Sequence, residues 1–219
     1  MQRLGYGDRF AAQGGDWGGG ITELIGTKKA AGCIGVHINA ISFEPTPDEV
    51  ATADDKELQA IERMNGYQSR LSGYFKEQST RPQTIGYGLA DSPVAQASWI
   101  YEKFNDWTDN AGDPESILSM DEMLDNIMLY WLNNAGASSA RRYCDHTVDS
   151  SRGALVEIPS AFSLFPKDIE GPARRWAQRR YTNIVRWSEA ARGGHFAALE
   201  QPVIFIEELR AAMRAISAT

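Results

Sequence analysis

The chain has 219 residues, of which 42% are hydrophobic and 23% are charged, a composition typical of a globular protein with one large core. Its formal charge of −7 argues against nucleic acid as a partner, because phosphate binding needs a basic face. The sequence contains neither a signal-type apolar run nor a membrane span, so we expect a cytoplasmic protein. Cys33 and Cys144 match no metal-ligand spacing, and we expect reduced thiols, no metal and no cofactor.

Short apolar segments predict four buried parallel strands. They lie, in chain order, at residues 9–13, 34–39, 154–159 and 184–187. A helix is expected to begin near Trp17, directly after the first segment, and a last helix is expected over residues 203–216. The basic cluster at residues 174–180 is typical of a solvated face of an amphipathic helix.

A long helical stretch interrupts the strands between the second and the third. Its apolar residues recur at helical spacing over residues 54–78 and 121–132, and a Ser-x-x-Glu capping box at 119–122 predicts the start of the second helix. Such an insertion covers the carboxyl ends of parallel strands, where ligands bind. We therefore predict an α/β fold in three parts: core residues 1–43, a helical cap at 44–145, and core residues 146–219.

Residues 13–18, Gln-Gly-Gly-Asp-Trp-Gly, contain a Gly-x-Asp-x-Gly string after the first predicted strand. Glycines on both sides permit a strained turn from strand to helix, which exposes the central side chain above the sheet. That side chain is the carboxylate of Asp16. A carboxylate nucleophile forms an ester with an alkylating carbon, so the string points to epoxides or haloalkanes as substrates and away from ester or amide hydrolysis.

His195 is the best candidate for a general base. It ends an Arg-Gly-Gly-His turn directly after the fourth predicted strand, although an ordinary loop histidine is the alternative. The other two histidines, His37 in the middle of a strand and His146 beside the end of the cap, lack such a setting.

A base needs an orienting carboxylate, and Asp168 follows the third predicted strand. Its carboxylate could accept the proton on one imidazole nitrogen and leave the other nitrogen free to act on water. The alternative for Asp168 is a helix N-cap, and Glu170 is the competing acid.

Taken together, these strings resemble the C-terminal part of an epoxide hydrolase of the microsomal type, an α/β-hydrolase with a helical cap. The matching segments are residues 13–18, 91–94, 102–108, 126–131 and 192–200, followed by Pro202, and they cover nearly the whole chain in order. The resemblance implies about four parallel strands with flanking helices. The acid-to-histidine spacing of such enzymes agrees with Asp168 and His195 (195 − 168 = 27), which favours Asp168 over Glu170.

The resemblance also implies a mechanism that opens an epoxide to a vicinal diol. Asp16 would attack an epoxide carbon while Tyr74 and Tyr143 of the cap donate hydrogen bonds to the epoxide oxygen. His195 would then activate a water that hydrolyses the ester, and the backbone amide of Trp17 would be one oxyanion donor. Without the resemblance, each tyrosine would be interpreted as a half-buried core residue.

Three tryptophans suggest an apolar substrate pocket in the cap, with a structural role as the alternative for each: Trp99, Trp107 and Trp131. The expected partners are a small-molecule epoxide and water. Two other functions stay open. A haloalkane dehalogenase-like hydrolase shares the aspartate and histidine, and a non-catalytic fragment or partner subunit would bind without turnover.

The segments that precede the aspartate in such enzymes, including a His-Gly-x-Pro turn that supplies a second oxyanion donor, do not occur in this sequence. A truncated gene model, a split protein with its N-terminal half on a separate chain and a decayed copy are the alternatives, and we favour the first two. We expect impaired activity of the chain alone. The unpaired edge of the first strand also predicts association, including a homo-oligomer, or poor solubility.

Overall fold

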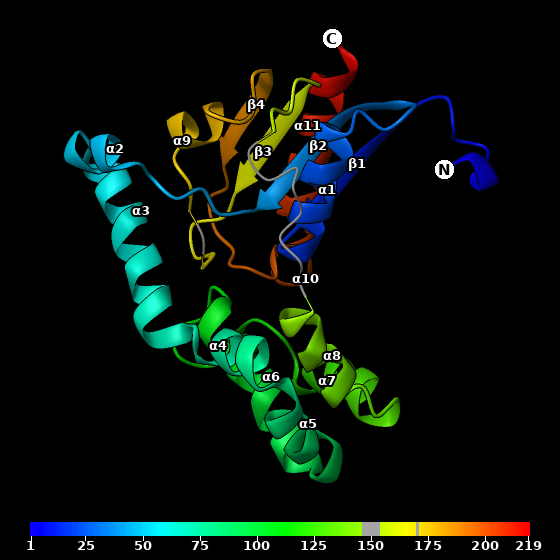
Figure 1. Ribbon diagram of the computed structural model, residues 1–219, viewed down its shortest axis with the longest axis vertical. Coiled ribbons are helices and arrows are strands. Elements are labelled where there is room, and N and C mark those ends of the chain that lie inside the picture. The colour runs from blue at the N-terminus through cyan, green and yellow to red at the C-terminus, as the bar shows by residue number, and fades with distance from the viewer. Residues whose placement is uncertain (146–153, 170) are drawn as a thin grey trace. The chain divides into compact units, whose positions relative to one another are not determined.

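The computed structural model describes residues 1–145, 154–169 and 171–219, and these residues form two compact units (Figure 1). The first unit combines Met1–Met64 with Ser150–Thr219 and contains the sheet. The second unit, Asn65–Asp149, is helical. The assignment of residues 44–145 as a cap over a substrate site stays a prediction.

The sheet unit is built on four parallel strands in the order β1-β2-β3-β4, side by side in Figure 1. Their bounds are β1 (Phe10–Gly15), β2 (Cys33–Ala40), β3 (Ser160–Leu164) and β4 (Ile184–Glu189). The register pairs Gln13 with His37 and Phe162 with Trp187. Strands β2 and β3 are central and almost fully buried, and this burial includes their polar side chains His37, Asn39, Ser160 and Ser163.

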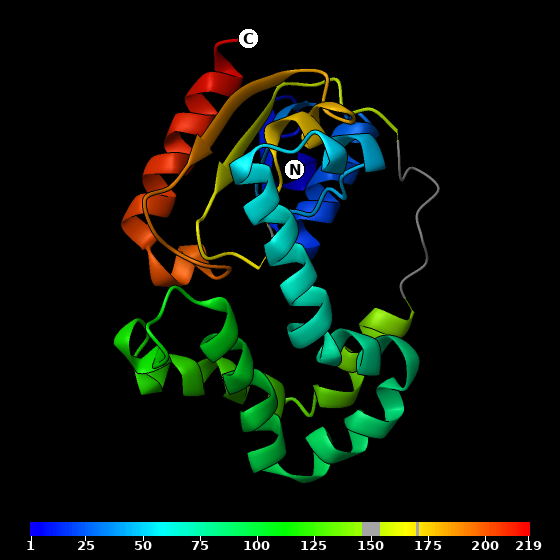
Figure 2. The ribbon, with the colours of Figure 1, turned by 90° about the vertical axis from the view of Figure 1, so that its left-hand side faces the viewer.

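Helices cover both faces of this sheet. Helix α1 (Trp17–Thr27) packs on the face of Val36, since a Cβ at Gly26 would lie 3.4 Å from that side chain. Helix α11 (Pro202–Ser217) covers the opposite face (Figure 2). There, Ile216 leaves no room for a Cβ at Gly35. Neighbouring strand residues point to opposite faces, so Gly35 and Val36 assign one helix to each.

The core of the sheet unit lies mainly on the α1 face. Phe162 stands at its centre, with ring centroids 4.9 Å from both Tyr181 and Trp187 and 6.3 Å from Phe43. The Tyr181 hydroxyl donates a hydrogen bond to Glu23 of α1 at 2.8 Å. This contact satisfies the buried phenol and ties the core to α1.

The predicted third strand at residues 154–159 was wrong. Only an isolated bridge between Val156 and Tyr181 forms there, and the strand begins at Ser160. The reason is Pro159, which has no N–H to donate and therefore cannot occupy a central strand. Its carbonyl still accepts a hydrogen bond from the Val36 amide at 2.9 Å.

The remaining elements of the sheet unit are short, apart from α3. They are the 3₁₀ turn η1 (Gln2–Leu4), α2 (Pro47–Ala51), α9 (Arg174–Gln178) and α10 (Ala197–Glu200), and α3 (Asp55–Gly66) runs into the helical unit. The basic cluster predicted to be helical corresponds to α9. Both faces of that helix are used, because Trp176 is fully buried and Arg175 pairs with Glu57.

The helical unit contains the π-helical turn η2 (Tyr67–Leu71), α4 (Gly73–Thr80), α5 (Pro82–Asp91), α6 (Pro93–Trp107), the 3₁₀ turn η3 (Pro114–Ser116), α7 (Met120–Leu132) and α8 (Gly136–Cys144). The capping box predicted at Ser119 forms, since its hydroxyl and backbone both bond within the first turn of α7. Helices α5 and α8 pack closely: a Cβ at Gly86 would lie 2.9 Å from Ala137, and one at Gly136 would lie 2.6 Å from Leu89.

A buried polar network joins three strands to α11. His37 is fully buried, and its Nε2 lies 3.0 Å from the Ser163 hydroxyl. The hydroxyls of Ser163 and Ser188 donate to the Glu208 carboxylate, which also accepts from Arg186 at 2.9 Å. Burial lowers the pKa of His37 from 6.5 to about 4, with the Glu208 charge acting against this shift and the Arg186 charge adding to it.

This network predicts a loss of stability in mild acid. Between pH 6.5 and 4 the unfolded chain binds a proton at His37 that the folded chain does not. As the pH is lowered through this range, the free energy of unfolding therefore decreases by about 3 kcal/mol through this group. Urea unfolding of the wild type and the His37→Gln variant at pH 7, 5.5 and 4.5 measures the difference. The variant should show the shallower pH dependence, and equal slopes would contradict the assignment.

Candidate active site

Asp16 occupies the sharp turn between β1 and α1. Its φ of 53° and ψ of −125° are uncommon for a residue with a side chain, and its amide donates a hydrogen bond to the Ala40 carbonyl at 3.0 Å. A Cβ at Gly14 would lie 2.1 Å from the Gly18 carbonyl oxygen, so this turn requires glycine before the aspartate. A Cβ at Gly18 would meet nothing within 4 Å, whereas one at Gly19 would lie 2.5 Å from the Ala40 oxygen. The second steric requirement therefore belongs to Gly19, not to Gly18.

The turn leaves the Asp16 carboxylate exposed and close to His195. The side chain is 56% exposed, and its Oδ2 lies 3.5 Å from Nε2 of His195. Trp17 is the first residue of α1, so its amide belongs to the positive end of the helix dipole, next to the carboxylate. The role of the Trp17 amide as an oxyanion donor stays a prediction.

His195 and Asp168 form a buried pair. The Asp168 Oδ1 accepts a hydrogen bond from Nδ1 of His195 at 2.7 Å, and their side chains are 2% and 5% exposed. The carboxylate selects the tautomer with the proton on Nδ1 when the imidazole is neutral, which directs Nε2 to Asp16. The three residues follow β1, β3 and β4, and meet at the carboxyl edge of the sheet.

Backbone contacts hold the two loops of the pair together. The Lys167 amide donates to the Gly193 carbonyl at 3.0 Å, one residue before Asp168 and two before His195. Gly193 has a φ of 115°, and a Cβ there would lie 2.8 Å from the Phe165 ring, so both the conformation and the space require glycine.

Glu200 is a further residue of the site that the sequence analysis did not single out. Its side chain is buried, and its two oxygens accept hydrogen bonds from the amides of Gly194 and Phe196, each at 3.0 Å. It therefore fixes the backbone on both sides of His195. The available signal was a single acid five residues after the histidine, at the end of the matching string 192–200.

The pKa of His195 is set by two opposing effects. Burial lowers it, but the hydrogen bonds to Asp16 and Asp168 and the negative charges of both carboxylates outweigh burial and raise the pKa to about 10. The two carboxylates thus favour the protonated form of the imidazole. Any reaction that makes Asp16 neutral removes one of the two charges that hold this proton.

The helical unit brings the two predicted tyrosines together. Tyr74 at the start of α4 and Tyr143 in α8 have ring centroids 5.8 Å apart at an interplanar angle of 86°. The Tyr67 hydroxyl, which the sequence analysis did not consider for catalysis, lies 2.9 Å from the Tyr74 hydroxyl. Lys103 places its Nζ 4.4 Å from the Tyr74 ring centroid.

The three predicted pocket tryptophans have different settings within this unit. Trp107 is buried, with its ring centroid 5.1 Å from that of Tyr74. Trp99 is half-buried and 5.8 Å from the Lys103 Nζ, and Trp131 is half-buried on α7. Trp99 and Trp107 thus surround Tyr74 and Lys103. Their role in substrate binding stays a prediction.

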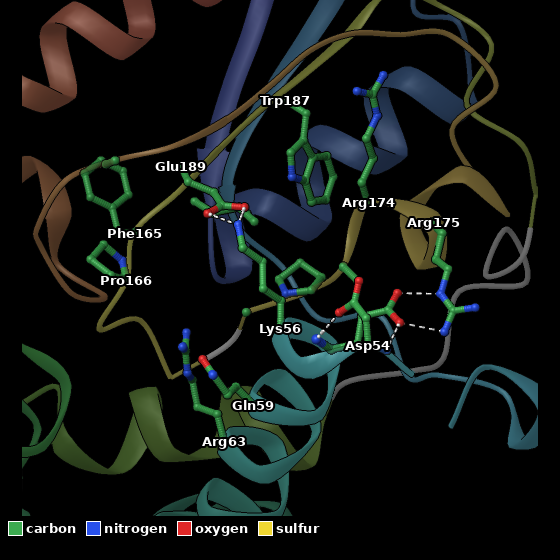
Figure 3. Close-up of a pocket in the computed structure, with 16 residues that line it drawn as sticks. Asp54, Lys56, Gln59, Arg63, Phe165, Pro166, Arg174, Arg175, Trp187 and Glu189 are labelled. Carbon is green, nitrogen blue, oxygen red and sulfur yellow. Dashed lines mark hydrogen bonds and ion pairs between the residues drawn. The ribbon is translucent and has the colours of Figure 1, made fainter. Parts of the chain in front are cut away.

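Figure 3 shows a pocket of about 480 Å³ in the sheet unit, lined by α3, the loop after β3, α9 and the end of β4. Residues that line the pocket form two ion pairs, Lys56 with Glu189 at 3.2 Å and Arg175 with Glu57. None of Asp16, Asp168 and His195 lines it. The candidate catalytic residues therefore lie outside this pocket.

Some candidates fall outside these descriptions. Glu170 and His146 lie outside the described residues. Among the residues that the structure describes, no group of three or more His, Cys, Asp or Glu side chains could hold a metal ion. No helix in that same part of the chain is long and apolar enough to cross a membrane.

The parallel sheet, its flanking helices and the aspartate on a strained turn after a strand define an α/β-hydrolase fold. Homologues of the chain are epoxide hydrolases of the microsomal type, which confirms the predicted resemblance. No protein-family model matches the chain.

Three proteins illustrate the similarity. A Stigmatella aurantiaca protein named as an epoxide hydrolase is 48% identical over 221 residues, which cover 100% of this chain and 49% of that protein. Epoxide hydrolase 1 of Sus scrofa is 32% identical, over 96% of this chain and 52% of its own length. The solved structure of Aspergillus niger epoxide hydrolase has a TM-score of 0.84 and 33% identity, over 99% of this chain and 55% of that one. The chain spans about half the length of the curated relatives it matches.

The two-carboxylate setting of His195 predicts the effect of neutralising Asp16. In the Asp16→Asn variant the pKa of His195 should fall below that of the wild type, because one hydrogen-bonded negative charge is lost. A histidine Hε1 titration by NMR measures this change. The His37→Gln variant should leave the His195 titration unchanged and identifies the second buried histidine. An unaltered His195 titration in Asp16→Asn would contradict the contact.

Proposed function

We propose that this chain opens epoxides to vicinal diols through a covalent ester on Asp16. The observation that carries the proposal is the exposed Asp16 carboxylate on a strained turn, 3.5 Å from an imidazole that a buried aspartate orients. The similarity to epoxide hydrolases supports the substrate class. A carboxylate has the right reactivity, since it is a nucleophile towards an alkylating carbon.

In the first step a carboxylate oxygen of Asp16 bonds to an epoxide carbon, and the carbon–oxygen bond of the ring breaks. The oxygen that leaves takes a proton from a phenol, and Tyr74 and Tyr143 are the proposed donors. This assignment of the tyrosines rests on the sequence resemblance, and their adjacent rings support a joint role.

The second step uses the change in charge at Asp16. Once Asp16 is an ester, it no longer holds the proton of His195 by charge, so the imidazole can lose that proton to solvent water and act as a base. It then takes a proton from water, and the hydroxide attacks the ester carbonyl. The amide of Trp17 is the proposed donor to the oxyanion. When that intermediate collapses, the departing alkoxide takes the proton from His195 and leaves as the diol. The carboxyl proton of Asp16 then passes to His195, which restores the Asp16 carboxylate.

The same aspartate and histidine would also serve a haloalkane dehalogenase, and a non-catalytic binding role would need neither. The phenols distinguish the two reactions, because a halide leaves without a proton whereas an alkoxide needs one. Tyrosine variants therefore separate epoxide opening from dehalogenation.

We expect Tyr74→Phe and Tyr143→Phe each to slow diol formation from a small aryl epoxide by about 100-fold or more, the usual cost of one lost donor to a developing oxyanion. Release of halide from a haloalkane, if the chain catalyses it, should be unchanged. Asp16→Asn should abolish both reactions. Phenylalanine variants that retain full epoxide turnover would contradict the proposal, and wild-type protein that binds epoxide without turnover would support the binding role.

A further inference from the structure

Lys103 of α6 is a buried cation in the helical unit. Its side chain is 10% exposed, and its Nζ lies 4.4, 5.3 and 5.8 Å from the ring centroids of Tyr74, Trp107 and Trp99. A buried ammonium is costly unless it is paired, and the Glu102 carboxylate, more than half exposed, supplies the ion pair. The charge is thus held against aromatic faces, which attract cations, with Tyr74 the nearest ring.

Tyr74 also has a phenol as its hydrogen-bond partner. The hydroxyls of Tyr67 and Tyr74 are 2.9 Å apart, and either could be the donor. Tyr67 begins the π-helical turn η2, a rare conformation that occurs frequently at functional sites. Tyr74 therefore has a cation at its ring and a hydroxyl at its oxygen.

This environment favours negative charge on Tyr74. When a phenol gives its proton to another oxygen, its own oxygen gains charge, which a nearby ammonium stabilises and an O–H donor stabilises further. Both effects are stronger in a partly buried site than in water. Lys103 is closer to the Tyr74 ring than to either tryptophan ring, so Tyr74 receives most of this stabilisation.

We infer that Lys103 and Tyr67 are positioning residues that make Tyr74 the proton donor of the tyrosine pair, with Tyr143 as the hydrogen-bonding partner of the substrate oxygen. The inference rests on the proposed function. As the bond from Asp16 to carbon forms and the ring carbon–oxygen bond breaks, the Tyr74 proton moves to the departing oxygen. The Tyr74 oxygen stays negative until water returns a proton to it.

A titration without substrate tests the environment of Tyr74. Ultraviolet absorption of phenolate is followed from pH 7 to 11.5, and subtraction of the Tyr74→Phe curve isolates the component that depends on Tyr74. In Lys103→Met and in Tyr67→Phe its midpoint should rise by roughly one pH unit, a tenfold change in the ionisation equilibrium. Lys103→Arg, which keeps the charge, should stay close to the wild type. Lys76→Met, at an exposed lysine of the same unit, is the matched control and should show no shift.

Single-turnover kinetics with a small aryl epoxide add the functional readout. Lys103→Met should slow ester formation about tenfold and leave the rate of ester hydrolysis unchanged. In Lys103→Arg, which keeps the charge, the rate of ester formation should stay close to that of the wild type. If Lys103→Met fails to fold by circular dichroism, Tyr67→Phe, which removes a single oxygen, carries both measurements.

The outcomes separate the two proposals. Unshifted midpoints in Lys103→Met and Tyr67→Phe would overturn this inference, and so would equal slowing of ester formation and ester hydrolysis. If the wild type opens no epoxide but the Lys103→Met and Tyr67→Phe variants show the predicted midpoint shifts, the proposed function is refuted. The effect of Lys103 and Tyr67 on the ionisation of Tyr74 would still be established.

Discussion

The site depends on one interaction, the position of a buried imidazole between two carboxylates. His195 is bonded to Asp168 at 2.7 Å and faces Asp16 at 3.5 Å, and their combined charge overcomes the burial that would otherwise lower its pKa. In the proposed reaction Asp16 loses its charge when the ester forms, and this removes part of the attraction that holds the proton on His195. In the proposed reaction the order of events therefore follows from electrostatics: the ester forms first, and water is activated second.

Much of the nearby structure serves to hold this arrangement. Gly14 lets the chain turn tightly enough to expose Asp16, and Gly193 lets the loop of the histidine pack on the Phe165 ring. Glu200 holds the amides around His195 from inside the fold. Each of these contacts joins segments at the carboxyl edge of the sheet, where parallel strands bring distant parts of a chain together. The strain at Asp16 is thus balanced by close backbone contacts.

The sequence predicted the features that depend on local patterns. Apolar runs located β1, β2 and β4, the capping box at Ser119 formed, and the glycine-flanked Asp16 adopts the expected turn. Asp168 was chosen over Glu170 by a spacing that the resemblance supplied, and the structure does bring Asp168 to His195. The third strand was misplaced because its prediction used the apolar run alone and did not consider that Pro159 has no backbone N–H to donate within a sheet.

Other features could not be predicted because they arise from packing between distant elements. Nothing local marks Glu200 as the acceptor for two loop amides, or Lys103 as a cation against aromatic rings. Tyr67 reaches Tyr74 through a π-helical turn, which periodicity analysis treats as ordinary helix. The burial of His37 against Ser163 likewise becomes visible only when the strands are aligned.

The central claim is that Asp16 forms a covalent ester, and intact-mass analysis of the His195→Ala variant tests it most directly. Removing the base blocks hydrolysis of the ester, so incubation with a small aryl epoxide should add the mass of one epoxide to the protein. The same variant with Asp16→Asn should gain nothing. The absence of an adduct from folded His195→Ala protein, or an adduct that persists in the double variant, would contradict the account.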